Sequence, residues 1–394
     1  MKKLIALLLA LVMVLGLVAC GAKEEAAPEA APEAAPEAAP EAAPEAAPEA
    51  VPEVAPEAGL PKIGFICWGY TDAESKTYVR LLDYAGEAVG FEPVYATYSD
   101  NEDIINQTET LIEAGCKGII TIIATPTQMD LCDKAGVYLS QWASEITDPD
   151  VVAYLEESPY WVGYSFSDNV LLGAQMVDKL YEAGCRNLLV AGPSSGNAVH
   201  DLRMSGIYAQ VEKYDDLQIV AEWRDPDWQN KVSDSVTSYL NMYPEIDGIV
   251  TTGGSNGICD ATVQVLVNTN NVGKVKYACV DVVDNTKAYF EEGSLTACVG
   301  FTCTDVVWLS TVMANKVNGW GAELPVSIHM QACVLTSAQD YDDFNTYVQG
   351  EGVQPFSADE YKSITYTLNP DVTVEDVEAL AGATSLEDLR SKAQ

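Results

Sequence analysis

The sequence predicts an α/β protein with two Rossmann-like lobes, each built on a parallel sheet. Three observations favour this fold class. Short apolar runs alternate with longer amphipathic stretches, and a similar helix-to-strand turn occurs twice. The segment from residue 59 to residue 394 is also too long for one simple core and suits two lobes.

Ten short apolar runs have the length and composition of strands. They cover residues 62–68, 92–98, 118–123, 137–142, 161–165, 187–191, 218–223, 248–252, 276–281 and 296–301. Stretches with helical periodicity lie between them, for example at 74–89, 102–114, 169–183, 228–243 and 257–269. Strands that alternate with helices in this way form parallel sheets that carry helices on both faces.

The repeated turn joins the end of a helix to a strand. Residues 113–117 (Glu-Ala-Gly-Cys-Lys) precede the third run, and residues 182–186 (Glu-Ala-Gly-Cys-Arg) precede the sixth. Glycine directly after the last helical turn is a common C-cap. Any α/β protein can reuse such a turn, so the repeat adds modest support for two similar halves.

The first residues have the pattern of a bacterial lipoprotein signal peptide. Lys2 and Lys3 precede an apolar run over residues 4–19, which has the length of a signal-peptide core. Residues 17–21 read Leu-Val-Ala-Cys-Gly, which resembles a lipobox. The resemblance implies that residues 1–19 are removed and that a lipid is attached to Cys20. An ordinary secretory signal with a chance cysteine is the alternative.

Residues 20–60 are predicted to form a disordered tether. The unit Ala-Pro-Glu recurs every four residues, with proline at positions 28, 32, 36, 40, 44, 48, 52 and 56. This composition buries too little apolar surface to offset the entropy of ordering, and regular proline with repelling glutamates keeps it extended. We expect the tether to hold a folded domain off the extracellular face of the membrane, in a cell of the Gram-positive type.

The charge of the chain excludes several partners. Asp and Glu number 59 against 21 Lys and Arg, which gives a formal net charge of −38. Such a surface repels nucleic acid and anionic lipid. We therefore expect no nucleic-acid partner, and contact with the membrane through the lipid anchor only.

The cysteines and histidines do not predict a metal site. Nine cysteines remain besides Cys20, and no Cys-x-x-Cys pair occurs among them. We expect most of them to act as small buried hydrophobic residues, although Cys298 and Cys303 could pair. The only histidines are His200 and His329, which excludes a histidine-rich site. No metal and no cofactor is predicted.

Ligands bind to parallel α/β sheets at the carboxyl ends of the strands, so residues that follow each run are candidates for the site. Aromatic and hydrogen-bonding side chains recur at these ends. The candidates are Trp68, Tyr70, Thr125, Gln141, Trp142, Trp228, Asn256, Asp281 and Phe301. Flat rings combined with donors and acceptors suit a polar ring that carries hydroxyl groups.

Six short segments occur in an order typical of one family. They are residues 62–68, 163–176 with Ser-Asp-Asn at 167–169, 201–206, 243–248, 280–281 and 292–297. Together they resemble the type 1 periplasmic binding proteins, the ribose- and galactose-binding group of ABC importers. The resemblance implies a three-crossover hinge near Ser167, Phe301 and Val334.

The same resemblance implies how the chain divides between the lobes. The N-terminal lobe would comprise residues 61–166 plus 302–333, and the C-terminal lobe residues 167–301 plus 334–394. Residues 350–394 extend past the matching region as a tail. This tail could cap the second lobe or return toward the hinge.

The resemblance also implies roles for four residues. Arg203 matches an arginine that donates to ligand oxygens, and Asp281 matches an aspartate that accepts from two sugar hydroxyls. Asn256 lies near a polar contact, and Trp228 lies near an aromatic residue that stacks on the ligand. The alternatives are a surface arginine at 203 and a helix cap at 281.

The sequence departs from the family at the fourth and last inter-lobe strands. Gln141 and Trp142 replace an Asp-Arg pair, and Phe301 replaces a polar residue. Residues 143–160 look like an insertion. The pocket is therefore expected to be more aromatic than a ribose site, which favours a glycoside, nucleoside or aromatic compound over a simple pentose. Packing into the core is the alternative role for Trp142 and Phe301.

The function that the resemblance implies is that of a substrate-binding lipoprotein of an ABC importer. Its lobes would close on a small polar ligand, a sugar or glycoside, and then dock on a permease. A ligand sensor for a signalling system, or a binding protein for a nucleoside, autoinducer or aromatic solute, is the alternative. An enzyme is not expected, because the glycine-rich turn at 253–257 lacks a P-loop lysine and no Gly-x-Ser-x-Gly occurs.

Overall fold

The computed structural model describes residues 59–71 and 73–392. Residues 58–394 form one compact unit. The predictions for the signal peptide, for Cys20 and for nearly all of the tether lie outside the described residues. Within the described residues, no helix combines the length and the apolar character needed to cross a membrane.

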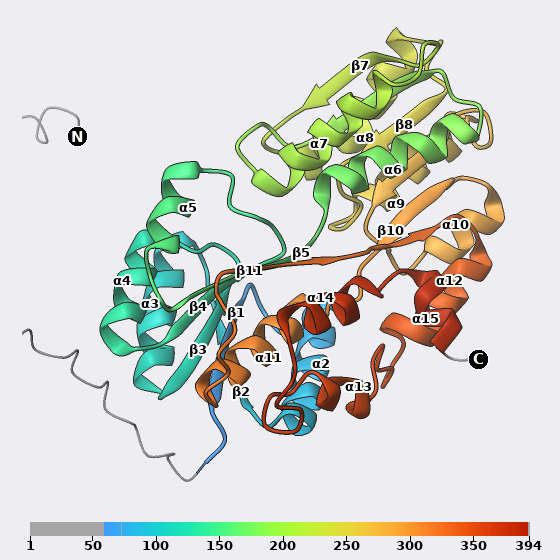
Figure 1. The fold of residues 1–394 in the computed structure, drawn as a ribbon. Coiled ribbons are helices and arrows are strands. Elements are labelled where there is room, and N and C mark those ends of the chain that lie inside the picture. Colours follow the sequence, from blue (N-terminus) through green and yellow to red (C-terminus); the bar gives the residue numbers. More distant parts are fainter. Residues whose placement is uncertain (1–58, 72, 393–394) are drawn as a thin grey trace, which may run out of the picture. The chain divides into compact units, whose positions relative to one another are not determined.

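The N-terminal lobe is built on a six-stranded sheet in the order β11-β5-β4-β3-β1-β2 (Figure 1). Neighbouring strands in this sheet all run parallel. The strands are β1 (Lys62–Cys67), β2 (Glu92–Thr97), β3 (Cys116–Thr121), β4 (Tyr138–Trp142), β5 (Trp161–Ser167) and β11 (Val326–Met330). A parallel sheet brings the carboxyl ends of its strands to one edge, so this lobe offers one such edge to a ligand.

The C-terminal lobe is built on a second six-stranded sheet, in the order β12-β10-β9-β8-β6-β7. Its pairs are parallel except that β12 runs antiparallel to β10. The strands are β6 (Asn187–Gly192), β7 (Gln218–Arg224), β8 (Gly248–Thr251), β9 (Lys276–Val280), β10 (Ala297–Gly300) and β12 (Cys333–Leu335). Two sheets of mostly parallel strands confirm the predicted fold class.

Helices cover both faces of each sheet. In the N-terminal lobe they are α2 (Ala73–Val89), α3 (Asn101–Glu113), α4 (Pro126–Ala135), α5 (Pro149–Glu156) and α11 (Asp305–Val317). In the C-terminal lobe they are α6 (Asn169–Glu182), α7 (Ala198–Val211), α8 (Trp228–Met242), α9 (Ile258–Asn268) and α10 (Thr286–Glu292). Alternate residues of β6 show the two faces: Leu189 packs with the α8 and α9 side, and Leu188 with the α6 and α7 side.

The chain passes between the two sheets at the three predicted crossovers. It leaves the first sheet after β5, returns after β10 through residues 301–304, and leaves again between β11 and β12 at residues 331–332. The hinge part of the predicted fold is therefore confirmed.

The tail follows β12 and contacts both lobes. It consists of α12 (Ala338–Phe344), the π-helix η1 (Asn345–Gln349), α13 (Ala358–Ser363), α14 (Val374–Gly382) and α15 (Leu386–Lys392). The helix α12 packs on α10, whereas α13 packs on α2 and α14 packs on β11 (Figure 1). This differs from the expected division, in which residues 334–394 belong to the C-terminal lobe, because apolar tail residues such as Tyr361 are buried against the N-terminal lobe.

All ten predicted strands are present, with ends that differ by at most two residues from the predicted ones. Two further strands, β11 and β12, were not expected. The predicted insertion at 143–160 contains α5, which begins with a cap from Asp148 and with Pro149 at its first position.

Candidate functional site

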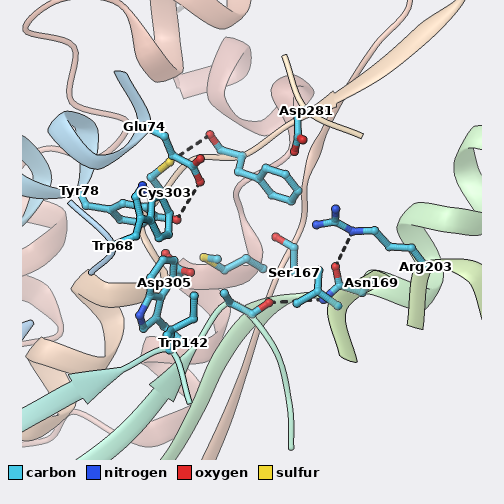
Figure 2. A pocket seen from close by; sticks show the side chains of 15 residues that line it. Trp68, Glu74, Tyr78, Trp142, Ser167, Asn169, Arg203, Asp281, Cys303 and Asp305 are labelled. Carbon is cyan, nitrogen blue, oxygen red and sulfur yellow. Dashed lines mark hydrogen bonds between the residues drawn. The ribbon is translucent and has the colours of Figure 1, made fainter. Parts of the chain in front are cut away.

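A cavity lies where the carboxyl ends of both sheets meet (Figure 2). Its volume is about 600 Å³, part of which is open to solvent. The lining residues are Trp68, Glu74, Tyr78, Ile122, Trp142, Ala143, Ser167, Asn169, Val199, Arg203, Asp281, Phe301, Cys303, Asp305 and Met330.

Arg203 is a buried cation on α7, held in place by two hydrogen bonds. Its Nε donates to Asn169 Oδ1 at 2.9 Å, and its Nη1 donates to the Thr252 carbonyl at 2.9 Å. These bonds leave Nη2 as the nitrogen not committed to the described part of the chain. Burial lowers the pKa of Arg203, and the charge of Asp281 opposes the shift, so the side chain stays charged.

The position of Arg203 depends on close packing between α6 and α7. A Cβ on Gly173 would lie 2.0 Å from the Arg203 carbonyl oxygen, and one on Gly206 would lie 1.9 Å from the Val170 carbonyl oxygen. Both distances are far below van der Waals contact. Glycine is therefore required at positions 173 and 206 for the close contact between α6 and α7, the helix that carries Arg203.

Asp281 follows β9 and has a rare left-handed backbone conformation, with φ of 88°. Its Oδ2 accepts hydrogen bonds from the backbone N–H groups of Gly254 and Ser255, each at 3.0 Å. Two donors on one oxygen fix the carboxylate and leave Oδ1 for a ligand. The glycine-rich turn therefore orients an acidic side chain.

His200 lies behind this polar pair and is neutral at physiological pH. Burial, followed by the charge of Arg203, lowers the pKa of His200 to about 4. Its Nδ1 is 2.8 Å from Thr252 Oγ1, and its ring contacts Trp228 edge-on at 5.5 Å between centroids. The histidine thus adds no charge beside Arg203.

The opposite wall of the cavity is aromatic. The rings of Trp68 and Trp142 lie 5.6 Å apart with an interplanar angle of 30°, and Tyr78 contacts Trp142 edge-on at 4.9 Å. Trp142 is almost fully buried, whereas 39% of the Trp68 surface is exposed. Phe301 lies on the other side, 5.8 Å below the guanidinium of Arg203. Rings in this arrangement suit the faces of a bound ring.

Asp305 is the first residue of α11 and belongs to the aromatic wall. Its surface is 4% exposed, and its Oδ1 has no hydrogen-bond partner in the described part of the chain. Burial raises the pKa of Asp305 to about 7, although backbone N–H groups, including that of Ala143, partly oppose the shift. A buried carboxyl oxygen without a partner at the cavity is unusual and suggests that a ligand supplies one.

Three residues that line the cavity have positive φ without being glycine. They are Ala143, Asp281 and Cys303, with φ of 69°, 88° and 58°. Such conformations are sparsely populated and cluster at binding sites, where the surrounding structure holds them.

Five of the ten residues predicted to bind the ligand line the cavity: Trp68, Trp142, Arg203, Asp281 and Phe301. These five come from four strand ends and from α7. The structure therefore brings the predicted arginine and aspartate together with three of the predicted aromatic residues.

Three of the other predicted residues hold the surrounding loops. The single O–H of Tyr70 is shared between two backbone carbonyls. Thr125 caps α4. The Gln141 amide accepts from the N–H of Ala124 at 2.8 Å and donates to the carbonyl of Ser144 at 2.9 Å, so its side chain is occupied inside the protein.

The remaining two predicted residues lie behind the polar wall. Trp228 is buried beside His200, with 5% of its surface exposed. Asn256 has a positive φ of 53° in the turn that precedes α9. Neither is among the residues that line the cavity.

Several lining residues were not predicted to bind the ligand, notably Glu74, Tyr78, Asn169 and Asp305. Asn169 did belong to the recognised Ser-Asp-Asn segment, so its position was available from the sequence. Asp305 carried a weaker signal: it is the acidic residue that begins an otherwise apolar helix directly after a crossover.

The chemistry of the described residues does not point to a metal. No group of three or more His, Cys, Asp or Glu side chains in residues 59–71 and 73–392 could hold an ion. The nine cysteines of this region are buried, and Cys298 and Cys303 do not form a disulfide. Their expected role as small buried residues is confirmed.

The two sheets and the cavity at their carboxyl ends define a two-lobed ligand-binding protein. A family model described as the periplasmic binding protein domain matches residues 64–319. The chain belongs to this family, as the resemblance predicted.

Similar proteins include a curated relative and many solved structures. The D-allose-binding periplasmic protein of Escherichia coli K12 is 27% identical over 145 residues, which is 36% of this chain and 45% of that protein. The chain therefore matches less than half the length of this curated relative.

Two solved structures show the same fold at low identity. A periplasmic sugar-binding protein from Pseudomonas fluorescens is 13% identical, with a TM-score of 0.66 over 84% of this chain and 100% of that one. A solute-binding protein of an ABC transporter from Actinobacillus succinogenes, solved with D-allose, is 18% identical, with a TM-score of 0.61 over 72% of this chain and 99% of that one.

Proposed function

We propose that this chain is the extracellular solute-binding component of an ABC importer and that it captures a sugar or glycoside in the cavity described above. One observation carries the proposal. Arg203 and Asp281 are both fixed by hydrogen bonds on one side of the cavity, and they face aromatic rings on the other (Figure 2).

The polar side would bind hydroxyl groups. The free Nη2 of Arg203 donates, and the free Oδ1 of Asp281 accepts, so one ring edge with adjacent hydroxyls satisfies both. A hydroxyl that lost its partner on entering the cavity would cost about 1–3 kcal/mol. Specificity would therefore lie in this pair.

The aromatic side would bind the faces of the ring. Trp68 and Trp142 offer the apolar surface that a sugar or glycoside presents on the faces of its ring. Closure of the two lobes about the three crossovers would bring these rings against the ligand and exclude water. The closed form would then dock on a permease.

The relatives support a sugar over other solutes. The curated relative is described as binding D-allose, and one structural relative was solved with D-allose. The large aromatic share of the wall favours a ligand with an apolar face, such as a glycoside, and a nucleoside is the second candidate for the same reason.

The anchor is part of the same proposal. Cleavage before Cys20 and lipid attachment there would place the domain on the extracellular face of the membrane at the end of the Ala-Pro-Glu tether. Such a placement suits a binding protein that must remain near its permease. Metabolic labelling with a radioactive fatty acid, compared between the chain and Cys20→Ser, tests it, and equal labelling of both would contradict it.

The ligand is tested by thermal unfolding of the purified full chain against sugars, glycosides, nucleosides and amino acids. A ligand that binds only the folded protein raises Tm by mass action. We expect a shift with one sugar class, and loss of that shift in Arg203→Ala and in Asp281→Ala. Arg186→Ala, at an exposed pair with Asp216, is the control.

Other outcomes of this screen would correct the proposal. A shift with nucleosides or amino acids alone would keep the binding mechanism and overturn the sugar assignment. Unchanged affinity in both cavity variants would overturn the assignment of the site. Chemical turnover of the bound ligand would show an enzyme instead.

A further inference from the structure

The cavity has more acidic than basic side chains. Three carboxyl groups line it, those of Glu74, Asp281 and Asp305, together with one cation, Arg203. Arg203 and Asp281 lie on the same wall and influence one another electrostatically. Their charges balance, which leaves the carboxyl group of Asp305, on the opposite wall, without a matching cation among the lining residues.

Asp305 is the acidic group most in need of a partner. It is 4% exposed, it lines the cavity, and its Oδ1 has no hydrogen-bond partner in the described part of the chain. Backbone N–H groups donate to this carboxyl group, but its Oδ1 does not share in them. A buried charged oxygen without a partner is unfavourable, whereas a hydrogen-bonded ion pair is tolerated. A neutral sugar hydroxyl would satisfy the hydrogen bond but would not balance the charge.

The surroundings of Asp305 suit a cation. Figure 2 shows Asp305 on the same side of the cavity as Trp68, Tyr78 and Trp142, away from Arg203. Aromatic ring faces attract ammonium groups, and the attraction grows when water is excluded. A carboxyl group beside aromatic rings therefore forms a receptor for a protonated amine.

We propose that the natural ligand is a polar ring that carries a protonated amine, as amino sugars do, and that Asp305 binds the ammonium group while Arg203 and Asp281 bind hydroxyls at the other end. This inference rests on the proposed function, because it names the class of sugar that the same cavity takes.

The assignment predicts a pH dependence. Burial raises the pKa of Asp305 to about 7, so the ammonium-binding form of this carboxyl group is lost as the pH falls below 7. The titratable groups that face it are Glu74, Tyr78 and Cys303, and burial keeps the pKa of both Tyr78 and Cys303 well above the usual range. Affinity for an amine should therefore fall by more than tenfold between pH 7 and pH 5.

The test is calorimetric titration of the purified full chain with D-glucosamine, D-galactosamine and D-mannosamine. Each is compared with its parent hexose and with its N-acetyl form, which keeps the nitrogen but removes the charge. We expect one amino sugar to bind at least tenfold more tightly than its two neutral analogues at pH 7. The preference should shrink at pH 5.

The variant Asp305→Asn removes the negative charge of this side chain and keeps its size and shape. It should reduce the preference for the amino sugar to less than threefold, whereas Asp216→Asn, on the exposed surface, should retain it. An amino sugar that binds Asp305→Asn as tightly as the unmodified chain would overturn the role of Asp305.

The outcomes distinguish this inference from the proposed function. A parent hexose that binds as tightly as its amino analogue overturns the inference and leaves the sugar-binding function in place. Absence of binding by every sugar of this panel, together with no Tm shift for any sugar or glycoside in the thermal screen, overturns both.

Discussion

The two walls of the cavity differ in how completely their polar groups are satisfied. On the C-terminal lobe, hydrogen bonds within the protein already hold Arg203 and Asp281. On the N-terminal lobe, Oδ1 of Asp305 and Nε1 of Trp142 have no partner in the described part of the chain. The side chains of the C-terminal wall are therefore already oriented before a ligand binds. The N-terminal wall has buried polar atoms that lack a hydrogen-bond partner until a ligand binds.

This difference indicates that the two walls contribute differently to the free energy of ligand binding and to the stability of the ligand-free protein. Prepared groups lose little entropy and need no rearrangement when a ligand binds, so they fix its orientation. A buried polar group without a hydrogen-bond partner destabilises the ligand-free protein, and this cost is removed when a bound ligand supplies the partner. We expect a change at Asp305 to alter stability as well as ligand preference, whereas changes in the C-terminal wall should alter mainly affinity.

The largest expected effect is on stability, in Asp305→Asn. The folded-state pKa of about 7 exceeds the ordinary aspartate value, so between pH 4 and pH 7 the folded chain holds a proton that the unfolded chain releases. The stability that this proton contributes is therefore lost as the pH rises, and it is fully lost above pH 7. The folded-state and unfolded-state pKa values differ by about three units, which corresponds to about 4 kcal/mol of unfolding free energy.

Urea unfolding of the ligand-free protein at pH 5 and pH 8 measures this effect. Asp305→Asn should be the more stable protein at pH 8, and its advantage should shrink at pH 5. The same pH slope in the variant and in the unmodified chain would show that Asp305 is not the group responsible. Asp216→Asn serves as the surface control.

A smaller effect is expected on the prepared wall, in Asn169→Ala. The substitution removes the acceptor of the Arg203 Nε and leaves the guanidinium free to reorient. Loss of one hydrogen bond to a charged group corresponds to about 1.5 kcal/mol, or roughly a tenfold lower affinity. Titration with the ligand found in the thermal screen checks it, and an affinity within twofold of the original would show that Arg203 does not depend on this bond.

The smallest expected effect belongs to Trp68, the more exposed of the paired tryptophans. Trp68→Ala should lower affinity by about threefold to tenfold, because one aromatic contact contributes about 0.5–1.5 kcal/mol beyond the area it buries. Trp68→Phe should recover most of the loss. Equal losses in both variants would indicate a specific contact to the indole nitrogen instead of ring stacking.

The alternation of apolar runs was enough to predict ten strands and the two-lobed architecture, but it did not predict β11. In β11 only Val326, Ile328 and Met330 are buried, while Ser327 and His329 are exposed. Such alternation in five residues at the edge of a sheet is a weak signal. The strand β12 has three residues, too few for any periodicity.

The candidate site was predictable where a motif or a strand end marked it. Arg203 and Asp281 belonged to recognised segments, and Trp142 and Phe301 ended predicted strands. Asp305 could not be found in this way, because acidic residues are common in the first turn of helices and an aspartate there does not by itself indicate a binding site. Gln141 shows the converse: a polar side chain at a strand end can serve the protein alone.

The tail adds contacts across the hinge that the three crossovers alone would not provide. In α15, Arg390 pairs with Asp340 of α12, and Lys392 pairs with Glu360 of α13. The Thr384 hydroxyl both donates to and accepts from the backbone of Gln331, within a crossover. We expect a rotation between the lobes to strain or break these contacts. Residues far from the ligand would then influence how easily the two lobes close.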